Sequence, residues 1–157
     1  MGWEGEAATL QLQPTSERSL VDEITNTVEA WWRHAALAQS EARADRLASD
    51  DLQWAWEAVD EVIATGGLQA VNLVAALVEA APGEAVEREM TYLGAGPLED
   101  LLVAHGGDAV VFAAVMERSR RDPSFRLALE GVWLEDAELP PATRPEWIRV
   151  GLRFING

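Results

Sequence analysis

The sequence predicts an all-α fold of about seven or eight short helices in antiparallel pairs. Apolar residues recur at steps of three and four along most of the chain, which is the spacing of one face of a helix. Cap-type residues, glycines and prolines separate these stretches at intervals of about 10–18 residues. No Asn-Gly turn joins alternating runs, so we expect no β-sheet. The pattern leaves a closed bundle and a short α-solenoid as alternatives, because no internal repeat is detectable.

The chain is expected to form one domain, since 157 residues are enough for a single hydrophobic core. Residues 1–14 show no consistent period and are predicted to be a loosely ordered N-terminal arm, followed by a single all-helical domain over residues 15–157. The tract 35–48 either extends the first helix or forms a polar connector. The expected helices span residues 15–38, 52–65, 68–80, 84–93, 97–105, 108–121, 122–133 and 143–155.

The stretch from Tyr92 to Leu102 is predicted to be the hinge between the two halves of the domain. Gly94 and Gly96 end one helical pattern, and Pro97 suits the first turn of the next helix, where its missing N–H is no loss. We expect a helix stop, a tight turn and a helix start, with both glycines at positive φ. Replacing either glycine with valine is then expected to lower the melting temperature.

The composition limits the classes of partner. The chain has no cysteine, and its net charge is −15 with all twelve basic residues arginine. Such a charge repels nucleic acids and anionic lipids, and attracts a basic protein. No apolar run approaches the roughly 18 residues that a membrane span needs, and the start of the chain is acidic where a signal peptide is basic. We therefore expect a cytoplasmic protein that binds neither nucleic acid nor membrane.

The seven tryptophans indicate where a contact surface would lie. Trp56 and Trp133 fall on apolar stripes and are predicted to be in the core. Trp31 and Trp32 are adjacent in a helix and point about 100° apart, so we expect Trp32 to be partly exposed, and likewise Trp54. Exposed aromatic residues are enriched at binding hot spots. The predicted contact patch consists of Trp32, Trp54, Glu57, Asp60 and Glu61.

The sequence contains none of the usual nucleophile, phosphate-loop or zinc-protease motifs, so no catalytic residue and no cofactor are assigned. A carboxylate and imidazole metal site remains an alternative if the acids of two helices meet in space. Its candidate ligands are Glu57, Asp60, Glu99, Asp100 and His105. A solvated acidic face explains the same spacing more simply.

The string Ala95-Gly96-Pro97-Leu98-Glu99-Asp100-Leu101-Leu102 and several segments around it resemble a bacterial all-helical family known only as a domain of unknown function. The resemblance covers about residues 50–133 and implies an all-helical fold. It implies no activity, cofactor or catalytic residue. The similar segments are residues 54–60, 92–102, 105–106, 122–129 and 131–133.

These observations lead to three hypotheses. The first is a non-enzymatic, acidic helical interaction module that binds a basic protein partner, in the manner of an immunity protein or antitoxin. The second is a small metal-dependent enzyme that uses the carboxylates and His105. The third is homo-oligomerisation through apolar helix faces.

Overall fold

The structure, a computed structural model, describes residues 15–83 and 86–155 and is mostly helical, as predicted. The predicted arm at 1–14 lies outside the described residues. The elements in chain order are α1 (Thr15–Ala38), α2 (Arg43–Asp50), α3 (Gln53–Thr65), α4 (Gly67–Glu79), α5 (Val86–Leu93), the π-helical turn η1 (Gly94–Leu98), α6 (Glu99–His105), α7 (Ala109–Arg121), α8 (Pro123–Glu130), β1 (Trp133–Glu135), the 3-10 turns η2 (Asp136–Glu138) and η3 (Pro141–Thr143), α9 (Arg144–Arg149) and β2 (Arg153–Ile155).

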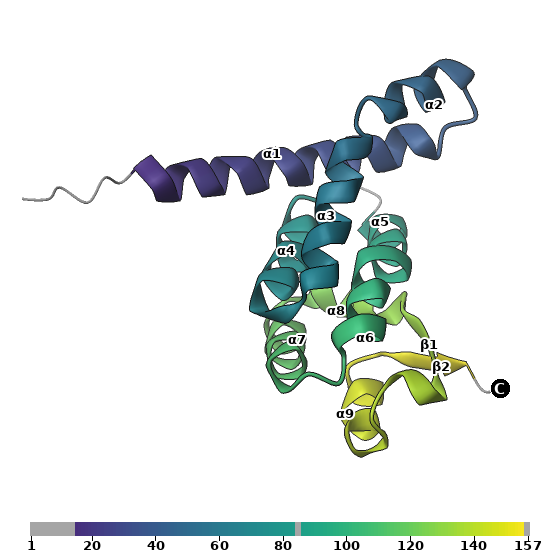
Figure 1. Cartoon of the computed structure of the whole chain (residues 1–157). Coiled ribbons are helices and arrows are strands. Elements are labelled where there is room, and N and C mark those ends of the chain that lie inside the picture. Colours follow the sequence, from purple (N-terminus) through teal and green to yellow (C-terminus); the bar gives the residue numbers. More distant parts are fainter. Residues whose placement is uncertain (1–14, 84–85, 156–157) are drawn as a thin grey trace, which may run out of the picture.

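Helix α1 lies across one end of the body, and its N-terminal half projects beyond the other helices (Figure 1). Helices α3 to α8 form the body, while β1, β2 and α9 lie at the end away from α1. The C-terminal half of α1 packs on α2, α3 and α4. The first four residues of the tract 35–48 belong to α1, which ends at Ala38, and the rest turns back into the separate helix α2. No helix in the described part of the chain is long and apolar enough to span a bilayer.

One hydrophobic core joins these elements. Its members come from nearly every helix, so the described chain packs around a shared interior rather than around separate centres. The largest fully buried side chains include Trp31, Met90, Leu102, Phe125 and Trp147.

The helix starts that the sequence marks with aspartate are confirmed. The side chain of Asp108 accepts hydrogen bonds from the amides of Val110 and Val111, and it caps α7. Asp122 caps α8 in the same way. Side-chain oxygens at this position satisfy amides that the first helical turn leaves without partners.

The C-terminal region contains strands, so the expectation of no β-sheet is wrong. Strands β1 and β2 pair in parallel, with Leu134 opposite Phe154. The helix expected over 143–155 ends at Arg149, and Gly151, at φ 109°, turns the chain into β2. Helix α9 begins at Arg144 without a side-chain cap. Burial of Leu134 and Leu152 holds the strands against the core.

Side chains from distant parts of the chain satisfy the last turns of three helices. The indole Nε1 of Trp32 donates to the carbonyl of Leu77 in α4 at 2.8 Å. His105 Nε2 lies 2.9 Å from the carbonyl of Ala64 in α3, and because a carbonyl only accepts, this nitrogen carries the proton. Arg126 donates to the carbonyl of Arg149 in α9. Each contact satisfies one of the carbonyls that a helix end leaves free.

The segment predicted as a hinge is a kink in a nearly continuous helical path. Helices α5 and α6 follow one another through η1, where only Gly96 has a non-helical backbone (φ −125°, ψ −108°). The amide of Glu99 bonds back to the carbonyl of Gly94, which is the five-residue spacing of a π-helix. The expected stop, tight turn and start are therefore wrong. Pro97 is buried inside this turn.

Neither Gly94 nor Gly96 has positive φ, so the conformational reason given for them is also wrong. Gly94 is instead required by close packing. A Cβ at Gly94 would overlap the carbonyl oxygen of Ala128 and lie 3.0 Å from the Cα of Gly131. A Cβ at Gly131 would in turn lie 3.0 Å from the Cα of Thr91. The two glycines thus let the end of α5 and the end of α8 approach backbone to backbone.

Candidate interaction surface

Helix α3 presents the acids that the sequence predicts for a contact patch. It buries Ala55, Val59 and Ile63, which recur every four residues, against the core. Side chains three and four positions apart share a face of a helix, so Trp54, Glu57 and Glu61 lie together on a different, outward stripe. All three are exposed, and Trp54 is 45% accessible.

Trp32 does not belong to this patch, and its predicted exposure is wrong. It is 6% accessible, and its indole bonds to α4. Trp31 is also buried, with the two rings edge to face at 4.9 Å between centroids. Both fit because α1 is covered from more than one side at this point. Periodicity gives the angle between the two side chains but not the number of neighbouring helices.

Trp56 and Trp133 are exposed, contrary to their predicted places in the core. Trp56 stands on the other flank of α3. There it lines a small pocket of about 50 Å³ together with Trp31, Asp60, Pro97 and Asp100. Burial, and secondarily the negative charge of Asp60, raises the pKa of Asp100 above its usual value. Asp60, three residues after Glu57, thus borders the stripe of Trp54, Glu57 and Glu61 on the flank that faces η1 and α6.

The acids of α3 have no basic partner within the described residues, where no ion pair involves Glu57, Asp60 or Glu61. The recorded pairs lie on other elements, such as Glu117 with Arg121 within α7. Unpaired exposed carboxylates keep their full charge available to a second molecule. Helix α3 is therefore an acidic ridge with an exposed tryptophan on each flank.

The candidate metal ligands are not assembled into one site. Glu99 accepts a hydrogen bond from the amide of Trp133, and His105 bonds to the end of α3. Among the residues that the structure describes, no group of three or more histidine, aspartate or glutamate side chains is arranged to hold a metal ion.

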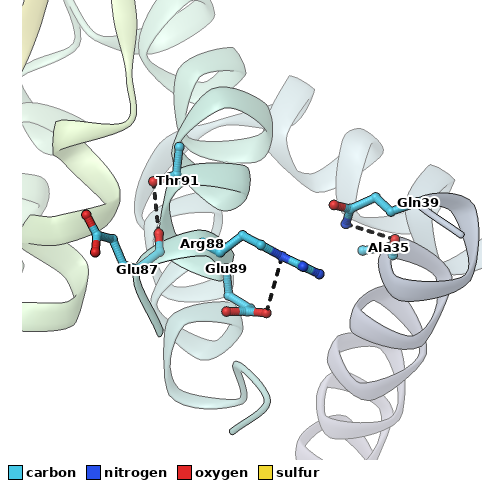
Figure 2. Close-up of polar contacts among 6 residues, drawn as sticks. All are labelled: Ala35, Gln39, Glu87, Arg88, Glu89 and Thr91. Carbon is cyan, nitrogen blue, oxygen red and sulfur yellow. Dashed lines mark hydrogen bonds and ion pairs between the residues drawn. The ribbon is translucent and has the colours of Figure 1, made fainter. Parts of the chain in front are cut away.

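A second small pocket, of about 40 Å³, lies where α5 faces α1. Figure 2 shows Arg88 reaching from α5 towards Gln39, the residue directly after α1, with Glu89 beside it. Arg88 Nε and Glu89 Oε1 are 4.0 Å apart, and the Arg88 side chain is largely exposed. Gln39 bonds to its own helix, at the carbonyl of Ala35. The pocket is too small for more than a water-sized group, so it offers little room for a ligand.

Residues 42–150 match the model of a family of unknown function, DUF6869. The chain belongs to DUF6869. The match contains α3, η1 and α6, and therefore the acidic ridge and the Trp56 pocket except for Trp31, because α1 precedes the matched region. No curated protein and no solved structure matches the chain significantly. Membership in DUF6869 confirms the resemblance seen in the sequence and carries no activity with it.

Two features of this surface were missed at the level of sequence. Trp56 was placed in the core, although the three buried positions of α3 already occupy the inward face. The exposure of Leu20 and Ile24, inside the helix expected over 15–38, was not anticipated either. The length of α1 could have indicated this exposure. A helix of 24 residues is about 36 Å long, which is more than a small body can cover.

Proposed function

We propose that this protein is a non-enzymatic interaction module that binds a basic protein partner through α3. The observation that carries the proposal is the ridge of exposed acids, Glu57, Asp60 and Glu61, without basic partners among the described residues. A concrete form is an immunity or antitoxin-like protein that masks a basic surface of a toxin.

The two exposed tryptophans indicate that the acidic ridge binds a protein rather than only dissolved small cations. Trp54 and Trp56 are 45% and 40% accessible. Large aromatic side chains supply much of the binding free energy at protein interfaces, whereas surrounding charges mainly set the rate and selectivity of association. With a net charge of −15, the protein would attract a basic surface over about a Debye length, roughly 8–10 Å at physiological salt.

The test is affinity capture from the source cell at low salt, followed by elution with salt. We expect a basic protein to be retained and released as ionic strength rises. Neutralising Glu57→Gln and Glu61→Gln together should slow association several-fold. The matched control is Glu79→Gln with Glu87→Gln, which makes the same change in net charge on α4 and α5. If no salt-sensitive partner is retained, the proposal is wrong.

A further inference from the structure

A groove of about 530 Å³ lies between residues 20–27 of α1 and the faces of α3 and α4. Its apolar walls are formed by Leu20 and Ile24 of α1, Ala58 and Val62 of α3, and Leu73 of α4. Three helices therefore contribute apolar side chains to the groove, and the rest of its lining is polar: Glu23, Thr27, Glu61, Gln69 and Asn72.

The α1 wall of this groove is left uncovered by the described residues. Leu20 is 56% accessible and Ile24 is 47% accessible, while the same helix becomes buried from Val28 onward. Burying such side chains would contribute a favourable free energy of roughly 25 cal/mol per Å² of apolar area. Exposed leucine and isoleucine one helical turn apart on the wall of a groove are typical of surfaces that receive another helix.

Charge identifies the kind of occupant. Glu23 of α1 and Glu61 of α3 line the groove, and none of the described residues that line it is basic. A second copy of this chain would bring another charge of −15 and would be repelled. A partner that has apolar residues on one face and basic residues beside it would be attracted.

We propose that the groove binds an amphipathic helix of the partner, with apolar residues at positions i, i+3, i+4 and i+7 flanked by arginine or lysine. This inference rests on the proposed function and adds the structural class of the partner segment. Glu61 belongs both to the acidic ridge and to the groove, so a helix seated in the groove would place its basic residues against the ridge.

The test uses a synthetic peptide of about 15 residues, roughly four helical turns, made of leucine on one face and lysine on its flanks. We expect saturable one-to-one binding to the full chain by calorimetry. Ile24→Asp should weaken binding about tenfold or more, because it places a charge in the apolar contact. Val21→Asp is the matched control: Val21 is 62% accessible on the same helix but does not line the groove, and both variants have the same net charge.

A second pair of variants tests the charge. Glu61→Gln should weaken peptide binding about two- to fivefold, and Glu57→Gln, which lies outside the groove, should have a smaller effect. Three results would overturn the inference. The first is equal weakening of peptide binding by Ile24→Asp and Val21→Asp, and the second is equal binding of a peptide with glutamate in place of lysine. The third is a dimer of the wild-type chain that only Ile24→Asp abolishes. If these results appear while affinity capture still retains a salt-sensitive partner, the groove inference fails and the proposed function stands. If the peptide binds as expected but no partner is retained, the proposed function fails.

Discussion

Replacing Gly94 with alanine is expected to lower the free energy of unfolding by about 3 kcal/mol or more. The added methyl group would overlap the Ala128 carbonyl oxygen and lie 3.0–3.1 Å from Gly131 backbone atoms. Backbone rather than a flexible side chain faces it on each side, so the end of α5 and the end of α8 must separate. Overpacking of a well-packed interior costs about 1–3 kcal/mol, and more where nothing yields.

The measurement is thermal unfolding followed by far-UV circular dichroism. For a domain of this size, 1 kcal/mol corresponds to a shift of about 2–4 °C, so Gly94→Ala should lower the melting temperature by about 6–12 °C. The control is Gly107→Ala, where the new methyl group would make ordinary contact with Pro140 at 3.5 Å. Equal melting temperatures for the two variants would refute the close-packing argument.

Three further variants test other features. Asp100→Asn should raise the melting temperature at neutral pH. The pKa of Asp100 is raised in the folded state, so the native state binds this proton more readily than the unfolded state does. The wild-type protein therefore loses stability as the pH rises above about 3.9, the usual aspartate pKa. The difference from the wild type should vanish below that pH, and a constant difference would contradict this account. His105→Ala should cost about 1 kcal/mol by removing the hydrogen bond to the end of α3, measured by urea unfolding. Trp32→Phe should cost about 1–3 kcal/mol because it leaves the Leu77 carbonyl unsatisfied, whereas Trp54→Phe, at an exposed position, should change the urea midpoint little.

Local signals account for most of the fold that was predicted correctly. Asp108 and Asp122 mark helix starts because a side-chain cap acts within three residues of its own position. The strands were missed for the opposite reason. Three residues around Leu134 pair with three around Phe154, and so short a parallel pair leaves no alternating pattern in either segment.

The candidate surface could be predicted only in part. The exposed stripe of Trp54, Glu57 and Glu61 follows from helical spacing alone, and the structure places these residues as expected. The positions of Trp32 and Trp56 depend on which neighbouring helices cover each flank, and a periodic pattern contains no such information. The role of Gly94 was misassigned because a glycine needed for close approach looks the same in sequence as one needed for positive φ.

Side chains of α1 contact helices that come later in the chain, and these contacts bear on where a stable fragment should begin. The family match begins at residue 42, yet Trp32 of α1 completes the end of α4, and Trp31 fills the core beside α3. A fragment cut to residues 42–150 would lose both, which leaves the Leu77 carbonyl without its indole partner and uncovers the core beside α3. We therefore expect the family region alone to be less stable than the chain that includes α1, so expression of fragments should begin before α1.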